Sequence, residues 1–287
     1  MAVYKLTYRG YSGAFTPDWS RFLVLFRYSR RSLFRSKLMN GFFILCFFVP
    51  LLGLLGMYAN AHMSAITFLG QRSAGPLFKV DGRFFLLFLS IQTTLAFILT
   101  AFIGPGLVSP DLANGGLTLY LCRPLSRLEY VLGKLSVLAI VLSAVTWIPG
   151  LALFFVQASL AGWDWMITNS WIASGIVLGS LLWILSISLL ALALSAWVKW
   201  RIAAGALLLG VLFLGSAFAA AINAALQTQQ GNILNISKLI NIVWQDLFHD
   251  SADRALPAGE AWLGLLVFGA LCFYVLMKKI RANEVVR

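Results

Sequence analysis

The sequence predicts an all-α integral membrane protein with six transmembrane helices. The 287-residue chain is 60% hydrophobic and only 11% charged, whereas soluble domains carry roughly 25% charged residues. Several apolar stretches reach about 20 residues, the length that a helix needs to cross the hydrocarbon core of a bilayer. Basic residues also gather on alternate sides of these stretches, as they do in multi-span membrane proteins.

The predicted spans are the long apolar runs without ionisable residues in their interiors. They cover residues 41–60, 84–108, 135–157, 171–197, 202–226 and 261–277. Residues 1–40 are then a cytoplasmic tail with an interfacial helix, and residues 41–287 form the transmembrane domain.

The distribution of basic residues predicts the orientation. With the N-terminus in the cytoplasm, 17 of the 22 Lys and Arg residues fall on the cytoplasmic side and five on the outer side. This asymmetry follows the positive-inside rule. We therefore expect a multi-pass protein of the inner (cytoplasmic) membrane with both termini in the cytoplasm. The net charge of +12 then reflects topology and attraction to anionic membrane lipids, and no nucleic-acid partner is expected.

Residues 16–38 predict an amphipathic helix that lies flat in the inner interface and leads into the first span. Thr16 and Pro17 suit the N-cap and the first position of a helix. Arg27 and Arg31 are one helical turn apart, among aromatic and aliphatic residues that recur at roughly helical spacing. The alternative is a basic flank that only sets topology.

A second amphipathic helix is predicted in the long outer segment 227–260. Apolar residues recur there at helical spacing between Ile236 and Leu247. The sequence leaves two arrangements open for the 233–250 region: a helix on the outer surface, or a re-entrant helix that dips into the membrane before the last span.

The residue types do not indicate catalysis. Ionisable residues inside spans usually mark proton or ion pathways, and none lies in the interior of a predicted span. The three cysteines, and His249 among its neighbouring aspartates, lack the spacing of a metal site. The segment Gly133–Leu135 lacks the other residues of a nucleotide-binding loop. We expect no catalytic residue, no metal and no cofactor in this chain.

Four polar residues within the predicted spans are candidates for a substrate path: Gln92, Thr93, Gln157 and Asn223. Hydrogen bonds between neighbouring helices are the alternative explanation for them.

The polar insert between the second and third spans predicts a short cytoplasmic helix. Ser109, Pro110 and Asp111 have the properties of an N-cap, a first helical position and an acidic first turn. Gly115 and Gly116 then end or bend this helix. The alternative is a simple turn between two spans that needs no partner.

The end of the insert predicts a well-defined start for the third transmembrane helix. Ser126 and Glu129 have the spacing of a capping box. Arg127 and Lys134 follow in the first two turns, where long basic side chains can extend towards the interface.

Residues 111–134 follow the pattern D-x-x-x-G-x-L-x-x-Y-L-x-R-P-x-S-R-x-x-Y-x-x-G-K. This stretch resembles the first cytoplasmic loop of type-2 ABC exporter permeases, in which an acidic residue and a Gly-Thr pair precede Arg-Pro-x-Ser-Arg and Gly-Lys. Asp111 stands where Glu is commoner, and the Gly-Thr pair is interrupted by Leu117. The N-terminal interfacial helix, the six spans and the long outer loop before the last span are also similar to that family.

The resemblance implies a membrane subunit that couples ATP hydrolysis by a separate cytoplasmic ABC ATPase to export or flipping of a substrate. It implies a second permease copy or paralogue as partner, with ATP and Mg bound in the ATPase. The implied ATPase-coupling residues are Asp111, Asn114, Gly116, Arg123, Pro124, Ser126, Arg127, Arg27 and Arg31. The alternative is a non-transport membrane component, for assembly, signalling or mechanical work, that uses the same ATPase-coupled fold.

The predicted topology places Cys122 on the cytoplasmic side, while Cys46 and Cys272 lie within apolar runs. A membrane-impermeant maleimide should therefore label the chain in inverted vesicles and leave it unlabelled in intact cells. Cys122→Ser should abolish the labelling, and labelling of Cys122 from outside would contradict the orientation.

Overall fold

A computed structural model of the protein describes residues 29, 37–62, 78–114, 126–198, 200–250 and 255–280. These residues form helices joined by turns and short connections, without a strand. Six helices are long and apolar enough to cross a membrane: Met39–Ala61, Gly82–Asp111, Arg127–Ala161, Ser170–Trp197, Arg201–Leu226 and Ala258–Lys279. Each of these helices contains one predicted span. The prediction of six helices long and apolar enough to cross a membrane is therefore confirmed. The predicted interfacial helix over residues 16–38 lies almost entirely outside the described residues.

Three of the candidate spans consist of two helices separated by a turn. Their pairs are α2 (Lys37–Leu45) and α3 (Phe48–Ala61), α5 (Gly82–Ile103) and α6 (Pro105–Ala113), and α8 (Arg127–Val145) and α9 (Trp147–Ala161). The remaining elements are α10 (Trp163–Thr168), α11 (Ser170–Trp197), α12 (Arg201–Leu226), the 3-10 helix η3 (Gln230–Leu234), α13 (Ile236–Leu247) and α14 (Ala258–Lys279).

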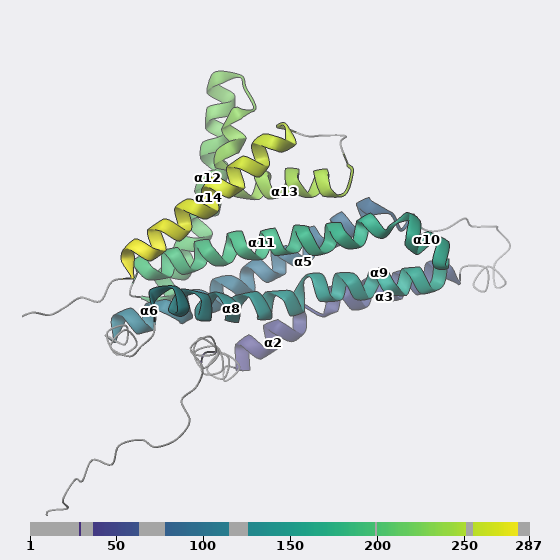
Figure 1. Cartoon of the computed structure of the whole chain (residues 1–287), viewed down its shortest axis with the longest axis horizontal. Helices are drawn as coiled ribbons and strands as arrows, with labels where there is room; N and C mark the ends of the chain where they lie inside the picture. The colour runs from purple at the N-terminus through teal and green to yellow at the C-terminus, as the bar shows by residue number, and fades with distance from the viewer. Residues whose placement is uncertain are drawn as a thin grey trace, which may run out of the picture.

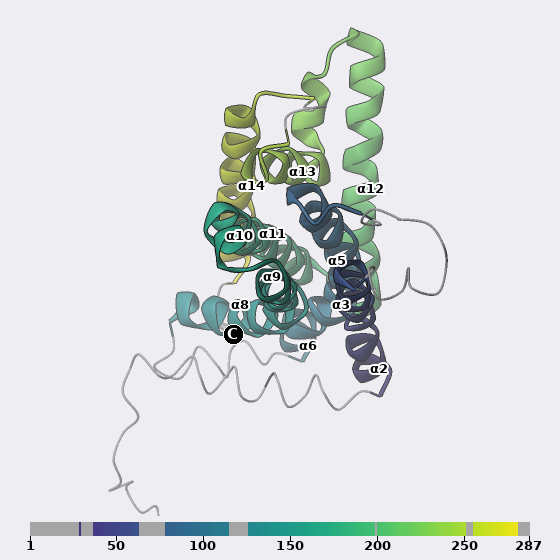
Figure 2. The same ribbon diagram turned by 90° about the vertical axis from the view of Figure 1, so that its right-hand side faces the viewer.

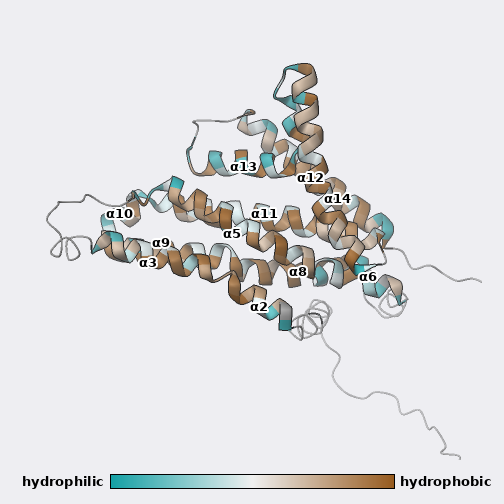
Figure 3. Ribbon diagram, turned by 180° about the vertical axis from the view of Figure 1, so that it is seen from behind, coloured by the Kyte–Doolittle hydropathy of each residue, from teal (hydrophilic) through white to brown (hydrophobic). Residues whose placement is uncertain are grey.

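Helix α11 forms the centre of the structure. It contacts α5, α6, α8, α9, α12, α13 and α14 (Figure 1). Its most apolar 18-residue stretch is 67% buried, against 17% for the first candidate span and 22% for α12 and α14. The outer helices instead expose large apolar side chains such as Phe213 and Leu266. Figure 3 shows hydrophobic residues along most of the length of these helices. Because lipid tails can cover such side chains, this distribution suits a helix bundle with an apolar exterior.

The segment between the last two candidate spans folds back on the bundle. After α12 the chain reverses, and η3 returns along it, with Gly231 N donating to Asn223 Oδ1 at 2.8 Å (Figure 2). Helix α13 occupies the predicted amphipathic segment and packs against the side of α11, where Trp244 Nε1 donates to the Gly179 carbonyl at 3.0 Å. Since Gly179 lies within α11 and not at its end, α13 runs beside this candidate span.

One side chain provides hydrogen bonds to backbone carbonyls at two helix breaks caused by proline. Proline has no N–H, so Pro50 and Pro149 leave the carbonyls of Cys46 and Val145 without their helical partners. Gln92, fully buried in the middle of α5, donates from Nε2 to both carbonyls, at 2.9 Å and 2.7 Å. The Gln92 carboxamide therefore connects three candidate spans through hydrogen bonds.

The third break, between α5 and α6, is stabilised from a neighbouring helix. Pro105 follows Gly104 there, and Arg201 Nη2 at the start of α12 donates to the Phe102 carbonyl at 3.1 Å. Gly104 also lies so close to Ala191 of α11 that a Cβ atom would stand 2.8 Å from the Ala191 side chain. A residue without a side chain is therefore needed where α5 crosses α11.

Replacing Gln92 by leucine should destabilise the fold, because two buried carbonyls would lose their donor. Each unsatisfied buried group costs about 1–3 kcal/mol. We expect a clear decrease in the melting temperature of the purified protein in detergent. Thr94→Val is the control, since the Thr94 hydroxyl bonds only the carbonyl of Ser90 in its own helix. Equal melting temperatures for the two variants would contradict the bridging role of Gln92.

Candidate functional site

A buried ion pair anchors the polar insert to the bundle. Lys134 Nζ in α8 lies 2.9 Å from Asp111 Oδ2 at the end of α6, and the side chains are only 5% and 19% exposed. Tyr130 Oη donates to the same carboxylate oxygen at 2.8 Å. Tyr130 and Lys134 are one helical turn apart and so lie on the same face of α8. The pair fixes the distance between α6 and α8 where the insert leaves and rejoins the bundle.

The same lysine reaches the N-terminal segment. Lys134 Nζ donates to Ser29 Oγ at 3.4 Å, and Ser29 is a buried helical residue. Lys134 therefore connects α8 with two parts of the chain that are distant in sequence, the end of α6 and the N-terminal segment. The Lys134 ammonium group does not lie free at the surface, because Asp111, Tyr130 and Ser29 surround it.

Ser109, the predicted start of the insert helix, lies within the second candidate span instead. Helix α6 begins at Pro105, and Ser109 and Pro110 lie inside it, so Ser109 is not an N-cap. Ser109 is instead fully buried against α11, where its backbone N–H donates to Ser195 Oγ at 3.0 Å and its hydroxyl donates to the Ser195 carbonyl at 3.0 Å. Ser195 Oγ in turn donates to the Pro105 carbonyl at 3.1 Å. The local cap signal was overridden by these contacts with the central helix.

The other end of the insert follows the prediction. Ser126 accepts from the backbone N–H of Glu129 at 3.2 Å, and the Glu129 carboxylate accepts from the N–H of Ser126 at 2.6 Å. This capping box starts α8 at Arg127. Helix α6 ends at Ala113, two residues before Gly115. Residues 115–125 are thus bounded by two helices that are joined by the Asp111–Lys134 pair.

The predicted coupling residues fall into three groups. Asn114, Ser126 and Arg127 are exposed at the two helix ends that bound the insert. Asp111 points into the protein, towards Lys134. The remaining five lie outside the described residues: Gly116, Arg123, Pro124, Arg27 and Arg31. Tyr130 was not predicted, although its spacing from Lys134 and the preceding acidic Asp111 were visible in the sequence.

The predicted substrate-path residues do not converge on one site. Gln92 bridges helix breaks, and Asn223 closes the turn between α12 and η3, where it also donates to Asn232 Oδ1 at 3.1 Å. Gln157 lies half-buried on α9. Of these four residues, Thr93 lines the cavity between α5, α11, α12 and α13, which has a volume of about 400 Å³.

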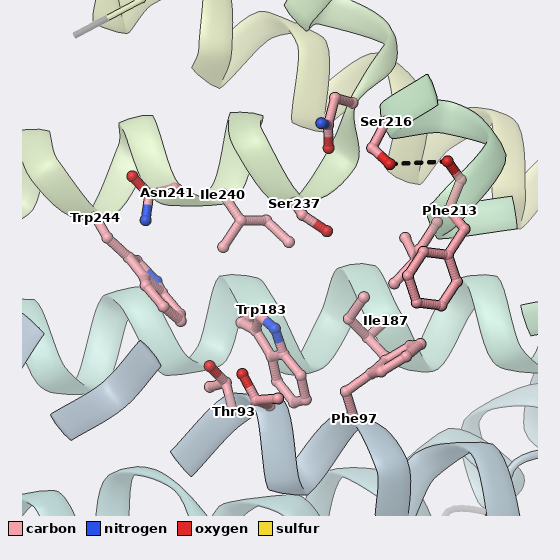
Figure 4. A pocket seen from close by; sticks show the side chains of 13 residues that line it. Thr93, Phe97, Trp183, Ile187, Phe213, Ser216, Ser237, Ile240, Asn241 and Trp244 are labelled. Carbon is pink, nitrogen blue, oxygen red and sulfur yellow. Dashed lines mark hydrogen bonds between the residues drawn. The ribbon is translucent and has the colours of Figure 1, made fainter. Parts of the chain in front are cut away.

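Side chains from four helices form the walls of this cavity (Figure 4). They are Thr93, Thr94, Phe97, Trp183, Ile187, Leu212, Phe213, Ser216, Asn235, Ser237, Ile240, Asn241 and Trp244. None of these side chains is charged. The cavity combines aromatic and aliphatic surface with amide, hydroxyl and indole groups, the mixture typical of small-molecule sites.

No protein-family model matches this chain, and no curated protein matches it. In the described part of the chain, no three His, Cys, Asp or Glu residues lie close enough together to hold a metal ion. The described residues contain two features that bear on function, the polar insert anchored by the Asp111–Lys134 pair and the uncharged cavity.

Removing Lys134 should destabilise the protein strongly, because the Asp111 carboxylate would remain largely buried without its cation. Loss of one partner of a buried pair costs about 3–5 kcal/mol. Lys134→Met should therefore lower the melting temperature in detergent, and adding Asp111→Asn should restore most of the loss.

Arg83→Met provides the matched control. Arg83 pairs with Asp250 at 3.2 Å, but its side chain is 70% exposed, and exposed pairs contribute about 0–1 kcal/mol. Similar decreases for Lys134→Met and Arg83→Met would contradict the anchoring role of the buried pair.

Proposed function

We propose that this chain is the membrane permease subunit of an ATP-driven ABC exporter. In this proposal a separate cytoplasmic ATPase binds the polar insert, and its ATP-dependent closure moves the spans to export or flip a substrate. The chain is not itself an enzyme, because ATP and Mg belong to the ATPase. It resides in the inner membrane with cytoplasmic termini and pairs with a second copy or a paralogue.

The observation that carries the proposal is the position of the Asp111–Lys134 pair. The pair lies at the base of the insert whose sequence resembles the coupling loop of these permeases, and it joins the ends of α6 and α8. A force applied to residues 115–125 would act on two spans that are fixed to each other. Rigid, packed elements transmit such displacements, whereas a flexible loop would absorb them.

A second connection continues the path into the bundle. Ser109 in α6 is bonded to Ser195 near the end of α11, the most buried candidate span. Displacement of α6 would therefore act directly on the central helix. Ser29 extends the path to the N-terminal segment, in which Arg27 and Arg31 are proposed to contact the ATPase.

The proposal assigns different roles to the insert residues. Asn114, Ser126 and Arg127, which are exposed, are proposed to contact the ATPase together with Gly116, Arg123 and Pro124. Asp111 supports the insert from inside and does not form part of the contact surface. Charge reversal at Asp111 would place two cations together at Lys134, so Arg123 is the better residue for a functional test.

The test is to co-express the chain with the soluble ABC ATPases of its source organism and to purify any complex. We expect co-purification and ATP hydrolysis that depends on the membrane subunit. Arg123→Glu should reduce this hydrolysis about tenfold or more, since truncating or reversing an interface charge removes a specific contact, while membrane insertion stays normal. Arg83→Glu, on the predicted outer side, should have no effect.

Two outcomes would contradict the proposal. They are the absence of any complex with the ATPase, and full ATP hydrolysis in the Arg123→Glu complex. The non-transport alternative would be favoured by a complex that hydrolyses ATP, transports no candidate substrate, and shows no change in ATP hydrolysis when a candidate substrate is added.

A further inference from the structure

The uncharged cavity lies at the middle of two candidate spans. Trp183 is 13 residues from Ser170 and 14 from Trp197 along α11. At a rise of 1.5 Å per residue, it stands about 20 Å from each end of the helix. Phe213 occupies the equivalent place in α12, 12 residues from Arg201 and 13 from Leu226.

The indole of Trp183 is an unusual group at this depth. Tryptophan normally concentrates at membrane interfaces, where its N–H can reach water. Here the residue is 94% buried, since only 6% of its surface is exposed, and its N–H has no hydrogen-bond partner among the described residues. By contrast, the N–H of Trp244 donates to the Gly179 carbonyl. Figure 4 shows the nitrogen edge of Trp183 turned towards α13, across the cavity.

Other donors face the same space. Asn241 on α13 lines the cavity, and its carboxamide has no partner in the described part of the chain. The first turn of α13 also begins here, because Asn235 and Ser237 are lining residues. Asn235 Oδ1 accepts from the N–H of Lys238 at 3.1 Å, which leaves the first-turn N–H groups of Ile236 and Ser237 without a partner within the helix. These N–H groups carry partial positive charge. These groups together favour a ligand oxygen that accepts hydrogen bonds.

The rest of the cavity is apolar and opens to the side. Phe97, Ile187 and Leu212 supply hydrocarbon and aromatic surface. Phe213 is 72% exposed and stands at the rim, on the outer side of α12. In a membrane this rim would face lipid tails, so a ligand with an apolar chain could enter laterally.

We propose that this cavity binds an uncharged amphiphile: an apolar chain attached to an ester, carbonyl or hydroxyl oxygen, as in acylglycerols. The oxygen accepts hydrogen bonds from the Trp183 indole and the Asn241 carboxamide, and the chain lies against the apolar wall. A charged head group is disfavoured because no lining side chain carries the opposite charge. A role of the cavity as the site for an exported substrate rests on the proposed function. Binding of an uncharged amphiphile in the cavity does not depend on that function.

The experiment uses the full chain in nanodiscs, without any ATPase, and a monoacylglycerol with a diazirine in its acyl chain. We expect saturable photolabelling of peptides from α5, α11, α12 and α13. Unlabelled monoacylglycerol should compete, and lysophosphatidic acid with the same acyl chain should compete at least tenfold less well. Equal competition, or labelling spread over α14 and the other outer helices, would overturn the proposal.

Trp183→Phe tests the donor while keeping an aromatic ring in place. Loss of one hydrogen bond should weaken labelling about two- to tenfold. Trp262→Phe is the matched control: it removes an indole N–H that bonds Asp246 Oδ2 at 3.3 Å, at a residue that does not line the cavity. Unchanged labelling in Trp183→Phe would show that the N–H faces only water and would overturn the assignment. Because no ATPase is present, failure of this binding and failure of the proposed coupling are separate results.

Discussion

Backbone groups inside an apolar bundle need partners, and this constraint determines how the six candidate spans meet. Prolines break three of the spans and free carbonyls that lipid cannot hydrogen-bond. Gln92 supplies donors for two breaks, and Arg201 donates to a carbonyl at the third. Each donor comes from another helix, so each break also becomes a junction. Helix α5 packs against α3, α8 and α9 around these Gln92 contacts.

A second junction lies at the end of the bundle where the polar insert begins. There the Asp111–Lys134 pair joins α6 to α8, and Ser109 joins α6 to α11. Burying a charged pair rarely adds stability in itself, because desolvation offsets much of the attraction. Its value here is geometric, since it fixes which ends of which helices lie together. In the proposed permease, that geometry connects the ATPase-binding insert to the centre of the bundle.

The cavity is chemically different from the insert, and sequence reasoning identified only one of its residues. Thr93 was a candidate because it is polar within a predicted span, and Gln92 was a candidate for the same reason. Their side chains serve different purposes, since Gln92 bonds two neighbouring helices while Thr93 faces the cavity. Polarity alone cannot separate these roles. Trp183 and Asn241 were missed because nothing in their local sequence shows that α11 and α13 run side by side.

The sequence by itself determined the features that depend on neighbouring residues. Hydrophobic runs long enough to cross a bilayer specify the six spans, and the Ser126–Glu129 spacing specifies the start of α8. The same local signals were misleading at Ser109, where contacts with α11 draw the residue into a helix that begins at Pro105. Only the tertiary structure decided which freed carbonyl meets Gln92, that Lys134 is paired with Asp111, and that the middles of α11 and α12 share a cavity with α13. These contacts join residues between about 20 and 100 positions apart, and the short-range periodicity that reveals a helix carries no information about which other helix packs against it.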